Sequence, residues 1–152
     1  MISLVDRSAQ QAIVDRLHRL RPDASRKWGR MTAPEMICHL NDSFLVSLGE
    51  KEASSKANIF SRTVMKFVAL NVPAPWPKDL PTMPEVKQGI GGTCPSDFQT
   101  DRDQLLRTFE RFCVPDPSVG QHPHPLFGIM SVEHWMRWGY LHTDHHLRQF
   151  GV

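Results

Sequence analysis

The chain has 152 residues, enough for a single domain over residues 1–152 that buries its own core without disulfide or metal cross-links. A hydrophobic fraction of 40%, a charged fraction of 22% and a net charge of +2 fit a globular protein and argue against a nucleic-acid-binding surface. There is no signal-peptide pattern, no apolar stretch of membrane-spanning length and no CxxC pair, so we expect a cytoplasmic protein with reduced thiols.

The first two predicted helices cover residues 7–20 and 32–49. Apolar residues recur at helical spacing in the first, and Pro22 follows it. In the second, the Thr32 hydroxyl can cap the helix while Glu35, three residues later, reaches back to the cap. Gly49 follows the apolar stripe of this segment and is a residue type that commonly ends helices.

A third helix is predicted over residues 55–70, where Ile59, Val64 and Phe67 are apolar. Residues 71–95 are rich in proline and glycine and show no strand alternation. A long segment without regular structure is unusual in an up-and-down bundle. We therefore expect it to be a crossover between helices that are not antiparallel neighbours.

Two further helices are predicted over residues 101–113 and 132–150. Pro115 and Pro117 follow the first of these, and Ser131 can cap the second. The sequence contains no convincing strand pattern and no internal repeat. The predicted fold class is therefore all-α, as a helical bundle.

The last predicted helix carries a histidine pair on one face. At about 100° per residue, five side chains fall within a sector of roughly 80°: Trp135, Trp138, His142, His146 and Gln149. Imidazoles at positions i and i+4 can converge on one cation, at about 2.0–2.1 Å from each nitrogen. The third ligand must come from another helix, and His39 in the second helix is the best candidate. The alternative is that the pair is only a polar flank of the helix.

The remaining histidines are interpreted as structural or solvated. His18 is expected to be a solvated helix residue, and His134 to serve the first turn of the last helix. His122 and His124 lie in a proline-rich loop and are expected to be turn or surface residues. Cys38 adjoins His39, but neighbours on a helix point about 100° apart, so both cannot easily bind the same ion.

Three residues on the same helix are candidates for binding a cosubstrate. Arg148, Trp135 and Trp138 could recognise an acidic or apolar molecule. The structural alternative is that Arg148 is solvated and favoured by the helix dipole, while both tryptophans belong to the core.

Three neutral imidazoles leave a divalent cation with at least one open position, which is the pattern of a catalytic metal. Such an ion can lower the pKa of water or hold a thiol as thiolate. Zinc or nickel fits this donor set best. Iron or manganese more commonly needs a carboxylate, which Asp42 or Asp144 could supply.

The motifs also resemble a known family. The run from His142 to Gln149 resembles the C-terminal HxxxHxxQ motif of the DinB/YfiT-like superfamily. Four segments are similar to one branch of this superfamily, the DUF1569 family of unknown function. They are the stretch from His124 to Gly128, the triplet Glu133-His-Trp135, the C-terminal His-His-Leu-Arg-Gln-Phe-Gly and the segment between Trp28 and His39. The resemblance covers most of the chain and is weakest in its middle.

The resemblance implies a fold and a site. The implied fold is a DinB-like four-helix bundle in up-down-down-up order, with a long crossover that contains the helix of residues 55–70. The implied metal ligands are His39, His142 and His146, with Trp138 and Arg148 as candidate cofactor-binding residues. Homodimers are common among such proteins, so a homodimer is implied as well.

Characterised members of the superfamily include transferases that attach a low-molecular-weight thiol to electrophilic compounds. The implied function is that of a metal-dependent thiol transferase or hydrolase acting on a small-molecule substrate. The alternative is a non-enzymatic helical bundle whose histidines are structural or bind a small ligand.

Overall fold

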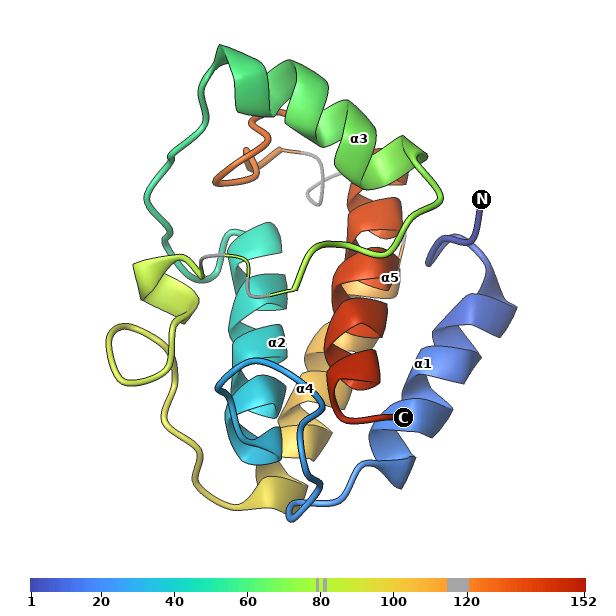
Figure 1. Ribbon diagram of the computed structural model, residues 1–152, viewed down its shortest axis with the longest axis vertical. Helices are drawn as coiled ribbons and strands as arrows, with labels where there is room; N and C mark the ends of the chain where they lie inside the picture. The colour runs from blue at the N-terminus through green and yellow to red at the C-terminus, as the bar shows by residue number, and fades with distance from the viewer. Residues whose placement is uncertain (79, 81, 115–120) are drawn as a thin grey trace.

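The computed structural model describes residues 1–78, 80, 82–114 and 121–152, and all regular structure in this part is helical (Figure 1). The elements are α1 (Arg7–Arg19), α2 (Ala33–Ser47), the π-helical η1 (Ser61–Met65), α3 (Lys66–Asn71), the 3₁₀ helix η2 (Pro84–Val86), α4 (Phe98–Cys113) and α5 (Val132–Gln149). The predicted all-α fold class is confirmed for these residues. None of their helices combines the length and the apolarity that crossing a membrane would require.

Four helices lie side by side and α3 crosses one end of them (Figure 1). Helices α1 and α5 run in one direction, and α2 and α4 run in the other. Because α2 and α4 are parallel, the chain must return along the whole molecule between them, and residues 48–97 make this return. The proline-rich segment is thus a crossover, as expected.

The helix ends follow the local sequence signals. The Thr32 Oγ1 accepts a bond from the Glu35 backbone N–H, while the Thr32 N–H donates to Glu35 Oε2 over 2.7 Å, which is the predicted capping box. Gly49 ends α2 with a φ of +74°, a left-handed conformation that favours glycine. Helix α4 begins before the predicted residue 101, because Asp97 caps it by accepting from the Thr100 N–H.

Helices α2, α4 and α5 share an aromatic core. Phe44 and Phe112 are fully buried, and their ring centroids are 4.8 Å apart. Gly139 on α5 permits a close approach, because a Cβ there would lie 2.7 Å from the Phe112 ring and 3.0 Å from Leu4. This close packing fixes the position of the next turn of α5, which begins the site described below.

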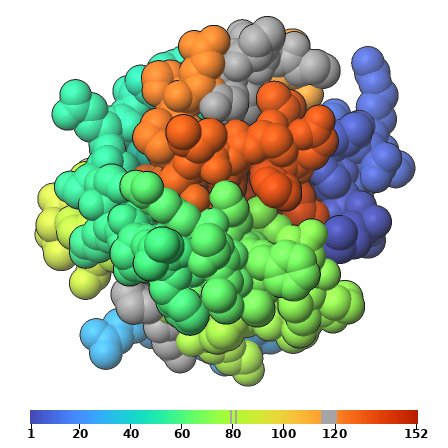
Figure 2. Space-filling model, turned by 90° about the horizontal axis from the view of Figure 1, so that it is seen from above, coloured from blue at the N-terminus to red at the C-terminus, as the bar shows by residue number. Residues whose placement is uncertain are grey.

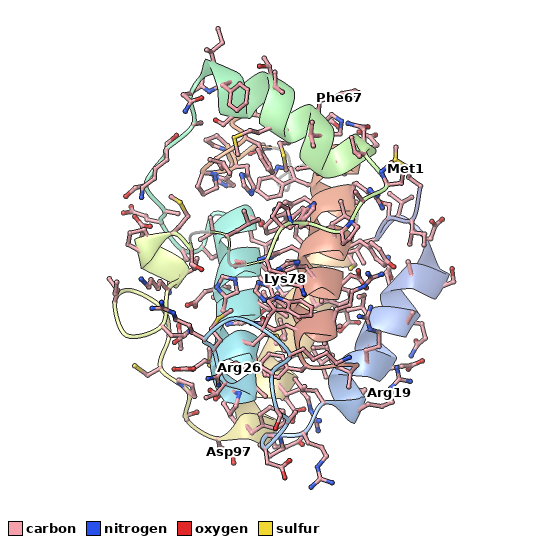
Figure 3. All side chains as sticks on the ribbon, viewed as in Figure 1. Met1, Arg19, Arg26, Phe67, Lys78 and Asp97 are labelled. Carbon is pink, nitrogen blue, oxygen red and sulfur yellow. The ribbon has the colours of Figure 1, made fainter. Side chains whose placement is uncertain are left out.

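The η1–α3 segment differs from its prediction in two ways. Helical structure begins at residue 59, not 55, and part of it is π-helical. Its apolar side chains are exposed, Ile59 by 83%, Phe67 by 64% and Val64 by 51%, whereas Ser61 and Leu70 are buried. Figure 2 shows the segment on the surface, and Figure 3 shows Phe67 at this end of the molecule. Apolar spacing predicted the helix but not which side chains it buries.

Candidate metal centre

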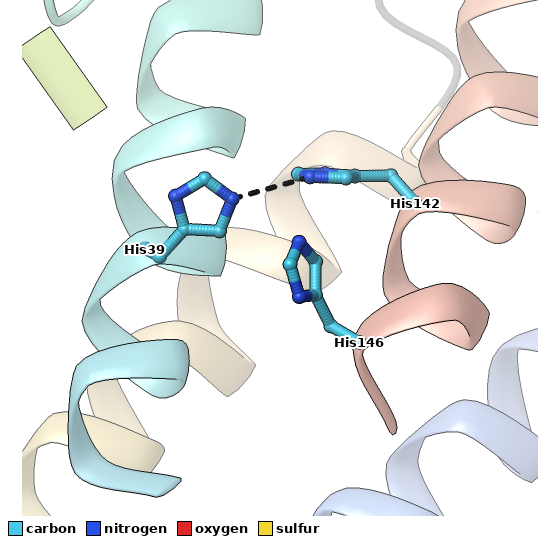
Figure 4. Close-up of side chains that lie close together, drawn as sticks. All are labelled: His39, His142 and His146. Carbon is cyan, nitrogen blue, oxygen red and sulfur yellow. Dashed lines mark hydrogen bonds between the residues drawn. The ribbon is translucent and has the colours of Figure 1, made fainter. Parts of the chain in front are cut away.

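The three predicted ligands meet between two helices (Figure 4). His39 comes from α2, and His142 and His146 lie one turn apart on α5. One nitrogen from each ring lies within 4.8 Å of the others, and the ring centroids of His146 are 4.8 Å from those of both His39 and His142. The described residues therefore contain a three-histidine group that could hold a metal ion.

Hydrogen bonds orient two of these rings. The Nδ1 of His39 lies 2.9 Å from the carbonyl oxygen of Val86, and the Nδ1 of His146 lies 3.1 Å from Oε1 of Gln149. Both oxygens are acceptors, so each Nδ1 must carry the proton and donate it. In the neutral rings the lone pair therefore sits on Nε2. A metal-binding histidine usually donates its other ring N–H to an acceptor of this kind.

The spacing of the nitrogens fits a shared cation. The Nε2 atoms of His39 and His142 lie 3.3 Å apart. Two nitrogens about 2.0–2.1 Å from one tetrahedral ion are separated by roughly 3.3 Å. Nitrogen lone pairs crowded at this distance repel unless a proton or a cation lies between them. The three imidazoles, the spacing of this one pair and the tautomers of His39 and His146 fit a metal ion.

Burial keeps the three rings neutral. It lowers the pKa of His39, a shift that the hydrogen bond to Val86 opposes. Burial also lowers the pKa of His142 and His146 well below the ordinary value, and the neighbouring imidazoles lower both further. Ligand histidines must be neutral, so this environment favours metal binding near neutral pH. His39 and His146 are only 4% and 8% exposed, whereas His142 is partly exposed.

The loop before α2 supports the orientation of His146 through Gln149. The Gln149 amide donates to the Trp28 carbonyl over 2.8 Å, and the Lys27 N–H donates to the Gln149 carbonyl over 2.7 Å. These bonds join the loop before α2 to the end of α5. Because Gln149 also accepts from His146, one side chain orients a candidate ligand and anchors this loop.

The two candidate carboxylates have other partners. Asp42 is fully buried, accepts from the N–H and the hydroxyl of Thr93, and pairs with Lys51 over 2.9 Å. It thereby fixes the crossover against α2. Asp144 pairs with Arg16 over 2.7 Å. The candidate ligand group in the described residues contains histidines only.

Trp138 and Arg148 lie on different sides of the triad. Trp138 is 7% exposed and stacks on His142, with ring centroids 4.8 Å apart and an interplanar angle of 24°. Arg148 pairs with Asp144 over 2.9 Å, and its side chain is 60% exposed. Trp138 thus supports a candidate ligand from the core side, while Arg148 faces outward.

His124 is not the surface residue that its loop predicted. It is 9% exposed, and its ring stacks on Phe127 with centroids 4.6 Å apart. Its Nδ1 accepts the backbone N–H groups of Leu126 and Phe127, each over 3.1 Å, so the turn assignment holds. Burial lowers its pKa to about 3. The surface expectation was wrong because a proline-rich loop gives no sign that it folds over two tryptophans.

Sequence patterns missed Val86 and Trp76, both in the crossover. Val86 orients His39, and the Trp76 ring lies 6.2 Å from the rings of both His142 and His145. The only local signal was a tryptophan within a run of prolines.

The comparisons with known proteins give one match. Residues 4–151 match a family described as "Protein of unknown function (DUF1569)", which covers nearly the whole chain. Neither the curated proteins nor the solved structures contain a match. The chain therefore belongs to the DUF1569 family.

Proposed function

We propose that the protein is a metal-dependent enzyme that holds one divalent cation, zinc or nickel, through His39, His142 and His146. The reaction would be the transfer of a low-molecular-weight thiol to a small-molecule substrate, or a hydrolysis. The observation that carries this proposal is the convergence of three imidazoles, two of them oriented through Nδ1 so that Nε2 faces the common centre.

The donor set supports this choice of metal. Nitrogen-only ligation suits zinc and nickel, whereas manganese and non-haem iron sites usually include a carboxylate. Three protein ligands leave one position of a tetrahedral ion open. When bound, the ion would lower the pKa of a water or a thiol at that position. The chain supplies the orientation of the rings, the partly exposed side at His142 and the stacking of Trp138.

The nucleophile would come from outside the chain. Cys38 adjoins His39, but burial raises the pKa of its thiol to about 12. Burial also raises the pKa of Cys113 to about 12. Neither of these two buried cysteines offers a thiolate at neutral pH, and we propose an external thiol or water as the reacting group.

The fold supports the same proposal. The directions of α1, α2, α4 and α5, together with the crossover, support a DinB-like four-helix bundle in up-down-down-up order. In this arrangement the ligand helices α2 and α5 pack against each other. The non-enzymatic alternative, in which the histidines only stabilise the bundle, uses the same geometry and is decided by experiment.

Elemental analysis of the purified protein tests the metal site. We expect about one equivalent of zinc or nickel in the wild type and less than about a tenth in His146→Gln. His145→Gln is the matched control, because His145 adjoins His146 but lies outside the ligand group. Equal metal content in both variants would refute the assignment of His146.

A cobalt-substituted protein tests the chemistry. Thiolate binding to Co²⁺ gives a ligand-to-metal charge-transfer band, so titration with 2-mercaptoethanol would report whether a thiol takes the open position. We expect the band with the wild type and none with His146→Gln. A d–d spectrum that the thiol leaves unchanged would contradict the transferase and leave hydrolysis to be assayed.

A further inference from the structure

A groove of about 890 Å³ lies beside the candidate metal centre. Its walls come from the loop before α2, the part of the crossover that follows α3, and the outward face of α5. His145, in the wall, has its ring centroid 5.3 Å from that of His146. The groove therefore lies one side chain away from the three-histidine group, although none of those three histidines lines it.

Two tryptophans line the groove beside His145. Trp28 lies 5.9 Å and Trp76 lies 6.2 Å from the ring of His145, and both are partly exposed. The Trp76 indole donates to the Ala69 carbonyl over 2.9 Å, and the backbone carbonyl of Trp28 accepts from Gln149. Aromatic side chains in a groove favour a flat or apolar body packed against them.

The charged side chains of the groove are mostly basic. The charged side chains of its described lining are Lys27, Lys78, Arg137 and Arg148 against one acidic side chain, Asp144. That carboxylate already binds Arg16 through Oδ1 and Arg148 through Oδ2. It therefore has no charge left to balance the other cations of the groove.

Two of the remaining cations, Arg137 and Lys78, have neutral partners. Arg137 donates to the backbone carbonyls of Leu70 and Ile2, and Lys78 lies over the Trp28 ring, 5.0 Å from its centroid. Carbonyls and indole rings satisfy hydrogen bonds and packing but carry no net charge. Positive charge gathered in a concave site attracts anions.

We propose that this groove binds a small molecule with an apolar, ring-like body and an anionic group. The body would pack against Trp28 and Trp76, and the anionic group would meet Lys78 and Arg148. This inference rests on the proposed function only in taking the bound molecule to be the substrate of the proposed enzyme. Binding in the groove itself needs no metal.

Isothermal titration calorimetry with three naphthalene probes tests the charge preference. We expect 1-naphthalenesulfonate to bind at least about tenfold more tightly than 1-naphthalenemethanol, and 1-naphthylmethylammonium to bind more weakly than both. The double variant Lys78→Gln/Arg148→Gln should lose about tenfold for the sulfonate and little for the alcohol. Equal affinities for sulfonate and alcohol in the wild type would overturn the proposal.

The metal-free variant His146→Gln separates this proposal from the proposed function. Sulfonate binding that persists there assigns the site to the groove, whereas loss of binding in a folded His146→Gln would place the anion at the metal and refute the groove. A wild type that holds no metal but binds the sulfonate would refute only the proposed function.

The four tryptophans offer a second, variant-free measurement. In ¹H–¹⁵N spectra the indole signals of Trp28 and Trp76 should shift on addition of 1-naphthalenesulfonate, while those of the core residues Trp135 and Trp138 should not. Shifts confined to the core pair would overturn the proposal.

Discussion

The three-histidine group and His124 are two buried histidine environments with opposite hydrogen bonding. In both, burial lowers the pKa and keeps the rings neutral. At His124 the Nδ1 accepts two backbone N–H groups, so its lone pair is used to hold a turn. At His39 and His146 the Nδ1 donates, so the lone pair on Nε2 faces a shared centre. Burial and titration alone would not tell these roles apart. The direction of one hydrogen bond does.

Removing one histidine from each environment gives the largest expected effects. His142→Gln should weaken zinc binding more than about hundredfold, because it removes one of three ligands, and should barely change the stability of the metal-free protein. His124→Leu should keep the metal but lower the free energy of unfolding by about 2–4 kcal/mol, because two backbone N–H groups lose their acceptor.

Competition against a chelator of known affinity measures the first effect, and urea unfolding of the metal-free proteins measures the second. The two roles would not be distinct if His124→Leu also emptied the site.

Gln149 tests the part that orientation plays in the three-histidine group. Gln149→Leu removes the acceptor of the His146 Nδ1–H. It should weaken zinc binding about 10–100-fold, the usual effect of losing the group that orients a metal-binding histidine. Gln149→Glu keeps an acceptor for His146 while losing the donor to Trp28, so it should retain most of the affinity. The same chelator assay applies, and equal losses in both variants would mean that the loop contact matters more than the imidazole.

A pH dependence of stability is expected as well. The pKa of His124 is about 3 in the folded protein, and near 6.5 in the unfolded chain. Below about pH 6.5 the unfolded chain takes up a proton that the folded protein refuses. Stability should therefore fall as pH falls from 6.5 toward 3, by up to about 1.4 kcal/mol per pH unit for this residue.

Urea unfolding of the metal-free protein at pH 7, 6 and 5 measures this slope. The His124→Leu protein should show a shallower slope than the wild type by about one proton, while the three-histidine group contributes equally to both. Identical slopes would show that His124 is not buried as a neutral ring.

Much of the site was predictable because its signals are local. The pair His142 and His146 follows from helical spacing, and α2, which carries His39, was marked by its capping box at Thr32. What the sequence did not show are the contacts across long separations, such as Val86 to His39 and Trp28 to Gln149. A crossover without periodicity offers no pattern from which such contacts could be inferred.

The η1–α3 helix shows the matching limit for the fold. Apolar residues predicted a helix at 55–70, and two of them, Ile59 and Phe67, face outward. Periodicity indicates that a segment can form an apolar face. Which residues cover that face depends on how the rest of the chain packs. On α2 the same kind of stripe is buried, because α4 and α5 cover it.

Gly139 gives the core a direct influence on the chemistry of the centre. With no side chain there, the Phe112 ring rests against the backbone of α5 one turn before His142. Even a methyl group would act as a wedge between the helices and tilt the imidazoles out of alignment with His39. The position of His142 relative to His39 thus depends on the absence of a side chain at Gly139 as well as on the histidines themselves.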